Sequence, residues 1–154
     1  MDDPFRRTSL GAAVFYRNPM VALDWLENAF GFRRVMVITD KDGNLAHAEM
    51  RFRDGYLMVG SEWAEYTTSP ASIGGKNTQS VHVHLQDGLD EHCEHARAAG
   101  AQIMREPEDQ FYGDRVYVAR DLEGHVWSFG QSVRKVSRED AELASGLNIE
   151  GWWE

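Results

Sequence analysis

The sequence lacks several features that would each indicate a particular class of protein. Its single cysteine, Cys93, cannot form a disulfide within the chain, and its place in a helical pattern favours a small buried side chain over a nucleophile. No apolar run approaches the roughly 20 residues of a membrane-spanning helix. The first residues, MDDPFRR, lack the apolar stretch of a secretory signal. We therefore expect a cytoplasmic protein that does not enter a membrane.

Clustered basic residues are also lacking. The chain of 154 residues has 16 Lys and Arg against 25 Asp and Glu, a net charge of −9. Because binding to a phosphate backbone needs clustered Lys and Arg, the charge argues against a nucleic-acid partner. The same negative charge would raise the local concentration of a cationic ligand. With 42% hydrophobic residues, the chain can bury one sizeable core.

An internal repeat is the main feature that is present. Each half reads strand, helix and three strands. The first half contains LGAAVFY, PMVALDWLENAF, FRRVMVITD, NLAHAEMRF and YLMVG; the second contains QSVHVHL, LDEHCEHARAA, AQIMRE, DRVYVAR and HVWSFG. We predict an α+β fold of two tandem βαβββ modules, residues 1–61 and 79–131, within a single structural domain. A linker at 62–78 joins them, and a tail with a short helix follows at 132–154.

Local signals predict where the helices begin and end. Asn18 is a typical N-cap residue before Pro19, and Gly31 is a typical C-terminal stop. In the second half, Asp87 can cap the helix and Gly100 can end it.

The stretch from residue 8 to residue 131 resembles the vicinal oxygen chelate superfamily, which contains glyoxalase I, extradiol dioxygenases, fosfomycin-resistance enzymes and bleomycin-resistance proteins. The resemblance is carried by ALDWLENAFGF, AAGAQI and, most specifically, YGDRVYVARDLEGHVWSFG. The chain is most similar to the PhnB-like, bleomycin-resistance-like branch. The resemblance implies curled mixed sheets that enclose a U-shaped cleft, a role in small-molecule binding or antibiotic resistance, and a homodimer. Whether the modules pair within one chain or swap between two stays open.

The metalloenzymes of that superfamily place one metal ligand on each of four strands. The positions that match here are Gly11, Met58, Ser80 and Ser128. None is a His or Glu, the donors that such enzymes use for zinc, manganese or iron(II). We therefore expect no metal and no other cofactor at this site, which argues against a glyoxalase or dioxygenase mechanism.

Strand alternation predicts which side chains face the cleft. In SVHVHL the aliphatic residues share one face, and Ser80, His82 and His84 share the other. By the same alternation, Trp127 and Phe129 lie on the face of their strand that is turned toward the helices, which favours packing in the core. The residues that we predict to bind the ligand are Phe15, His47, Glu49, Arg51, Tyr56, Met58, Ser80, His82, His84 and Ser128.

Three interpretations of the strand histidines stay open. His82 and His84 could be satisfied by neighbouring side chains or water, or they could contact a ligand. A displaced metal site built from both of them with His47 and Glu49 is the third, because imidazoles and a carboxylate are suitable donors.

Two functions follow from these interpretations. We predict a binding protein that binds or sequesters a small compound in the cleft, and the acidic charge and aromatic residues favour a cationic aromatic one. The alternative is a lyase, isomerase or dioxygenase-type enzyme that uses the displaced metal site or a general base. His82 or His84 would be that base, because imidazole titrates near neutral pH.

Other polar and aromatic residues are expected to have structural roles. His92 and His95, which have acidic neighbours, are predicted to be solvated. Arg115 is predicted to pair with an acid. Trp152 and Trp153 are expected to pack on the body of the protein or on a partner chain.

Overall fold

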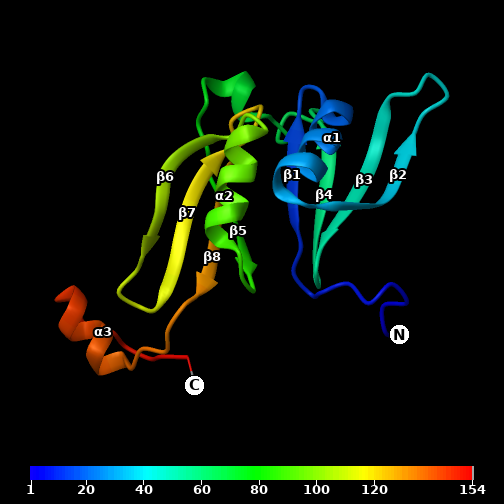
Figure 1. Ribbon diagram of the computed structural model, residues 1–154. Coiled ribbons are helices and arrows are strands. Elements are labelled where there is room, and N and C mark those ends of the chain that lie inside the picture. Colours follow the sequence, from blue (N-terminus) through cyan, green and yellow to red (C-terminus); the bar gives the residue numbers. More distant parts are fainter. Residues whose placement is uncertain (154) are drawn as a thin grey trace.

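The computed structural model describes residues 1–153 and contains two four-stranded mixed sheets (Figure 1). The first sheet has the order β1-β4-β3-β2 and is built from β1 (Ala12–Tyr16), β2 (Arg33–Thr39), β3 (Leu45–Phe52) and β4 (Gly55–Ser61). The second has the order β5-β8-β7-β6 and is built from β5 (Val81–Leu85), β6 (Gln102–Asp109), β7 (Asp114–Arg120) and β8 (Val126–Ser132). In each sheet the first and last strands of the repeat pair in parallel. The predicted α+β fold with a duplicated strand and helix order is confirmed.

One α-helix follows the first strand of each repeat, α1 (Pro19–Phe30) and α2 (Leu89–Ala98). Gly31 ends α1 with φ +82°, as predicted, because glycine adopts the left-handed conformation without steric cost. Asn18 is the N-cap of α1 and precedes Pro19 as predicted, although its side chain makes no capping bond. The cap predicted at Asp87 is wrong, because α2 begins after Gly88. A short 3-10 helix, Pro70–Ile73, lies in the segment between the sheets.

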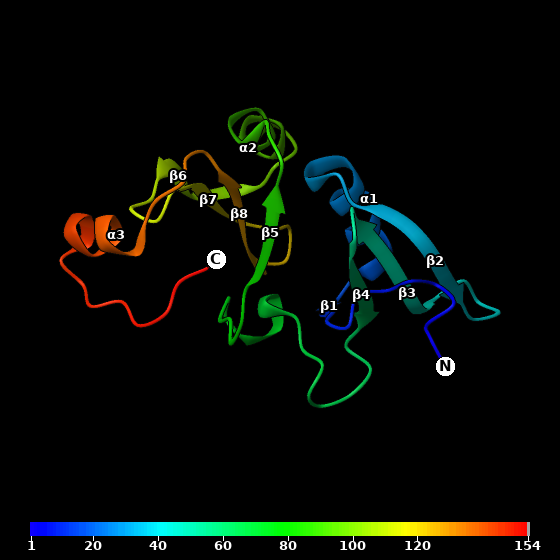
Figure 2. The ribbon, with the colours of Figure 1, turned by 90° about the horizontal axis from the view of Figure 1, so that it is seen from below.

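The two repeats share one hydrophobic core. Figure 2 shows α1 and α2 side by side with a sheet on either side of the pair, and the two helices are in contact. The ring of Phe30, at the end of α1, lies 5.4 Å from Trp127 and 4.8 Å from Phe129 on β8. All three side chains are fully buried, which confirms the predicted core role of Trp127 and Phe129. Burial of each such side chain contributes on the order of 2 kcal/mol, so this cluster fixes the two repeats against each other.

A second joint forms around the turn between β7 and β8. The imidazole of His125 donates from Nε2 to the carbonyl oxygen of Phe15 in β1, at 2.7 Å. The carboxylate of Glu123 accepts from the backbone N–H groups of Arg17 and Asn18. These bonds hold the start of α1 against the second repeat. They also give His125 a structural role between the repeats.

His92 on α2 differs from the prediction that it is solvated, whereas His95 is exposed as predicted. His92 is half-buried; its Nε2–H donates to the carbonyl oxygen of Phe30 at 2.9 Å, and its Nδ1 accepts from the Tyr117 hydroxyl at 2.6 Å. Nε2 of His95 donates to the carbonyl oxygen of Asn28 at 2.6 Å. The last carbonyl groups of a helix have no partner within the helix, and these imidazoles supply donors to the end of α1. The acidic neighbours of His92 in the sequence therefore did not indicate that its side chain lies against the end of α1.

The chain after β8 forms the predicted short helix, α3 (Arg138–Ser145). The Ser137 side chain accepts from the Asp140 N–H at its start. Trp152 donates from its indole N–H to the carbonyl oxygen of Val136 at 3.1 Å, whereas Trp153 is 95% exposed. Trp153 therefore does not pack on the body of the protein, and its packing on a partner chain stays a prediction. No helix among the described residues is long and apolar enough to cross a membrane.

Candidate ligand-binding cleft

A cleft of about 950 Å³ lies where β1 and β4 of the first sheet approach β5 of the second. Its walls combine small, aromatic and imidazole side chains. They are formed by Leu10, Gly11, Ala12, Ala13, Phe15, Phe32, Phe52, Arg53, Asp54, Gly55, Tyr56, Leu57, Gln79, Ser80, Val81, His82, Val83, His84 and Gln86. One arginine and one aspartate are the charged residues among them, so the walls are close to neutral.

Two aromatic rings of the first wall lie against glycines of the neighbouring strand. A Cβ on Gly11 would lie only 2.7 Å from Cε1 of the Tyr56 ring, so this ring covers the bare backbone of Gly11. A Cβ on Gly60 would lie 3.2 Å from the ring of Phe15, its register partner. Because glycine has no side chain, both rings can lie close to the sheet. Both rings therefore contribute aromatic surface to this wall of the cleft.

The second wall carries an imidazole that is fixed by its neighbours. His82 and Ser128 are register partners on the parallel strands β5 and β8, and Nδ1 of His82 lies 2.6 Å from Oγ of Ser128. A Cβ on Gly130 would lie 3.0 Å from the His82 ring, so this ring also lies over a glycine. Partial burial, with a smaller effect from His84, lowers the pKa of His82 below its usual value. Because Nδ1 is engaged with Ser128, a neutral His82 offers Nε2 to the cleft, as a donor or an acceptor according to the tautomer.

The ten predicted binding residues fall into three groups in the structure. Five of them line the cleft together: Phe15, Tyr56, Ser80, His82 and His84. Ser128 lies behind His82 as its hydrogen-bond partner, and Met58 is half-buried on the same inner face of the first sheet. Sequence reasoning missed the aromatic pair Phe32 and Phe52, whose rings are 5.5 Å apart, and the turn residues Arg53 and Asp54. The RDG turn signal lay in the sequence, but a turn alone does not indicate that it borders a cleft.

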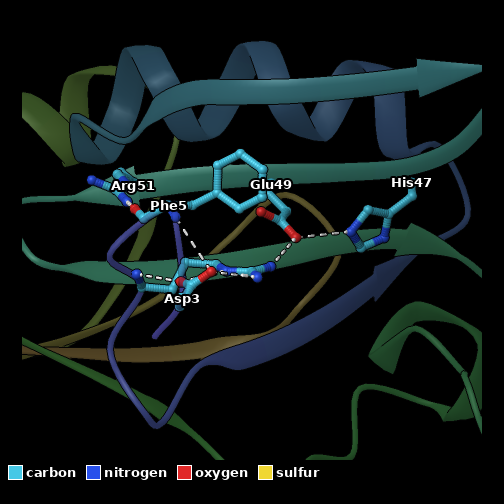
Figure 3. A network of polar contacts seen from close by, with 6 residues as sticks. Asp3, Phe5, His47, Glu49 and Arg51 are labelled. Carbon is cyan, nitrogen blue, oxygen red and sulfur yellow. Dashed lines mark hydrogen bonds and ion pairs between the residues drawn. The ribbon is translucent and has the colours of Figure 1, made fainter. Parts of the chain in front are cut away.

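The other three predicted residues, His47, Glu49 and Arg51, face the inner side of β3 as alternation predicts but do not line the cleft. Arg51 and Glu49 contact the chain segment that precedes β1, as Figure 3 shows for Phe5 beside Arg51, whereas His47 lies 3.4 Å from the Glu49 carboxylate. Arg51 donates to the carbonyl oxygen of Phe5, and Glu49 forms an ion pair with Arg7. Alternation fixes the face of a side chain, but not which distant segment covers that face.

The cleft does not present a suitable set of metal donors. The four positions that match the family's ligands hold Gly11, Met58, Ser80 and Ser128, and the Ser128 hydroxyl is engaged with His82. Among residues 1–153, the one group of His, Cys, Asp and Glu side chains close enough to share an ion is Cys93, Glu94 and Glu106, outside the cleft.

Arg97 already bridges the two glutamates of that group, at 3.3 and 2.6 Å. Burial raises the pKa of Cys93 to about 11, which opposes the thiolate form that binds metals. Among the described residues, His47 and Glu49 do not form a group of this kind with His82 and His84.

The duplicated fold and this cleft define a class of protein. A family model described as the Glyoxalase/Bleomycin resistance protein/Dioxygenase superfamily matches residues 11–129, and the chain belongs to this superfamily. The segment that carries Arg7 and the tail that carries α3 lie outside the matched region.

Similar proteins cover most of the chain. TioX from Micromonospora sp. ML1 is 34% identical, with a TM-score of 0.65, and the match covers 84% of this chain and 100% of TioX. An uncharacterized protein of Mycobacterium tuberculosis is 31% identical over 134 residues, which is 84% of this chain and 78% of the relative. The fosfomycin resistance protein FosX from Mesorhizobium loti is 13% identical with a TM-score of 0.57, covering 80% of this chain and 91% of FosX. That last similarity shows the shared fold alone.

Proposed function

We propose that this protein binds a small aromatic compound in the cleft between β1, β4 and β5 and sequesters it without a metal ion. The observation that supports the proposal most strongly is the Tyr56 ring lying on Gly11, opposite a wall with the imidazoles of His82 and His84. Small-molecule sites typically have volumes of about 300 to 1,000 Å³ and mostly apolar walls with a few polar groups. This cleft fits that description.

The favoured ligand is a flat aromatic molecule, and a cationic one is favoured further. Rings stack on exposed aromatic faces, and a cation is attracted to the negative face of a ring such as that of Tyr56. The net charge of −9 adds a long-range attraction for cations. A protein that withholds such a compound from its target would confer resistance to it, which fits the proposed role in antibiotic resistance.

We also propose a homodimer. The edge strand β2 exposes four consecutive apolar side chains, Val35, Met36, Val37 and Ile38, which are 38% to 50% exposed. An edge strand with an apolar surface is a typical contact site for another chain. Size-exclusion chromatography with light scattering tests this proposal: twice the monomer mass is expected, and a monomer at high protein concentration would contradict it.

A lyase or isomerase is the second candidate function, and the pair of His82 and Ser128 favours it. A neutral imidazole in a cleft can act as a general base, and its 2.6 Å bond to a hydroxyl orients the ring. An enzyme would lose turnover with His82→Ala while keeping ligand affinity, whereas a binding protein shows no turnover at all.

Calorimetric titration with a panel of neutral and cationic planar aromatic compounds tests the binding proposal. We expect saturable equimolar binding that Tyr56→Ala weakens about tenfold or more, equivalent to ~1.4 kcal/mol. Tyr66→Ala is the matched control, because Tyr66 is exposed and lies outside the cleft. No binding across the panel would contradict the proposal. A parallel titration with zinc, manganese or nickel should leave the melting temperature unchanged, and equimolar metal binding that His82→Ala removes would favour an enzyme.

A further inference from the structure

The guanidinium of Arg7 lies in surroundings that resemble a binding site for a cation. Its NH1 is 3.6 Å from Oε1 of Glu49, and its Cζ is 5.3 Å from the ring centre of Phe5 and 6.0 Å from that of Tyr56. A carboxylate and aromatic faces around a cation are the two contacts that proteins use to recognise guanidinium and ammonium groups.

Glu49 is the fixed anionic part of this arrangement. Its side chain is only 15% exposed, on the inner face of β3, where Nε2 of His47 lies 3.4 Å from the same Oε1. Figure 3 shows the Glu49 carboxylate pointing toward His47 and the segment before β1. A partly buried carboxylate is costly without a counter-charge, and Arg7 is the cation that the described residues place beside it.

This position is continuous with the cleft. Glu49 is the register partner of Met58 on β4, and Met58 is in turn the partner of Ala13, which lines the cleft on β1. Tyr56, which approaches Arg7, lines the cleft as well. A ligand that stacks in the cleft could therefore extend a charged group toward Glu49.

Arg7 is attached to this site through contacts that are easily broken. Asp3 accepts from Nε and NH2 of Arg7 at 3.0 Å each, and from its backbone N–H at 2.7 Å. The side chains of Asp3 and Arg7 are both about one-third exposed, and exposed ion pairs contribute little free energy because water and salt screen them. Glu49 and Tyr56 belong to the sheet and would stay in place if Arg7 moved.

We propose that Glu49 and Tyr56 form a cation subsite at the end of the cleft, and that Arg7 of the same chain fills it until a ligand with an amidinium or guanidinium group displaces it. This inference rests on the proposed function and names the ligand class more closely: planar aromatic amidines and guanidines. Arg7 then acts as a competitor that selects for ligands carrying such a group.

Benzamidine, a planar aromatic amidine, tests the subsite by calorimetric titration. Arg7→Ala should bind benzamidine at least tenfold more tightly than the wild type, because the competitor is gone. Arg6→Ala is the matched control: it removes the same charge from a neighbouring arginine that makes no ion pair among the described residues, and the affinity should not change. The double variant Arg7→Ala/Glu49→Gln should lose the gain. Equal affinity in the wild type and Arg7→Ala, or a gain that survives Glu49→Gln, would overturn the proposal.

Benzamide, the uncharged counterpart of benzamidine, separates the subsite from the cleft. If benzamide and other neutral aromatic compounds bind all variants alike while benzamidine shows no Arg7-dependent gain, the subsite is wrong and the cleft stands. If benzamidine shows the gain and neutral compounds bind no variant, the subsite stands and the aromatic-binding cleft is wrong. Circular dichroism and thermal melting of each variant confirm that the compared proteins are folded.

Discussion

The hydroxyl of Tyr16 donates a hydrogen bond of 2.7 Å to Oδ2 of Asp121, and both residues are buried where the two repeats meet. The same carboxylate accepts from the indole N–H of Trp127 and from the backbone N–H groups of Glu123 and His125. A buried carboxylate with this many donors organises the turn between β7 and β8 and attaches it to β1. The relative position of the cleft walls depends on this joint.

Tyr16→Phe should therefore destabilise the protein. Removing the hydroxyl leaves one lone pair of a buried carboxylate without its donor, which typically costs about 1 to 3 kcal/mol. Urea denaturation followed by circular dichroism measures this loss. Tyr66→Phe, which changes an exposed tyrosine, should shift the unfolding free energy by less than about 0.5 kcal/mol. Equal stability of Tyr16→Phe and the wild type would show that the joint does not depend on this bond.

Gly11→Ala should weaken ligand binding with little effect on the fold. The new methyl group would overlap the Tyr56 ring and force it away from Gly11, which displaces the aromatic surface that the ring presents to the cleft. Gly55→Ala is a matched control in the same cleft, because its Cβ would meet only the Phe52 carbonyl oxygen at an ordinary 3.5 Å. Titration of both variants with the best ligand of the aromatic panel should give a lower affinity for Gly11→Ala alone. Equal affinities would mean that ligand binding does not depend on the position of the Tyr56 ring over Gly11.

Protein stability should fall as the pH drops below the usual pKa of histidine, and His92 should contribute to the fall. Burial is the main cause that lowers the pKa of His92 in the folded state, although the Phe30 carbonyl opposes the shift. Above pH ~6.5 the imidazole is neutral in both states and the shift has no effect; below it the unfolded chain binds the proton first, which favours unfolding. Glutamine can also donate and accept, so His92→Gln should show a smaller loss between pH 7 and pH 5. A chemical denaturation series measures this, and identical losses in both proteins would contradict the assignment.

Ser128→Ala should reduce affinity less than His82→Ala does. The serine hydroxyl fixes the His82 ring through Nδ1 but does not line the cleft itself. Without the Ser128 hydroxyl the His82 ring is free to rotate. Ordering this ring then reduces the free energy of ligand binding by about 0.5 to 1.5 kcal/mol. The two variants, titrated with the same compound, should rank in that order. A larger loss for Ser128→Ala would place the hydroxyl in direct contact with the ligand.

The sequence predicted the structure best where a pattern among nearby residues determines it. Alternation on β5 predicted that His82 and His84 share a face away from the core, and the duplicated strand and helix order predicted both sheets. The end of α1 at Gly31 was predicted from a signal that acts within one turn, and a short helix was predicted within the tail that contains Arg138–Ser145. These features depend on residues close together in the chain.

Contacts between distant segments could not be predicted in the same way. The covering of Glu49 by Arg7 depends on where the segment before β1 crosses the sheet, which no local pattern encodes. The contacts of His92 and His95 depend on the packing of α2 against the end of α1. Glu49 was predicted to face a ligand and His92 to face water, and in each case a distant segment of the chain contacts the side chain instead.

The central claim is that the cleft holds an organic molecule through rings and imidazoles and does not hold a metal ion. A crystal grown with zinc and soaked with the best aromatic ligand, measured at the zinc absorption edge, tests both parts at once. We expect electron density for a planar molecule between Tyr56 and His82 and no anomalous peak in the cleft. An anomalous peak coordinated by His82 or His84 would contradict the account.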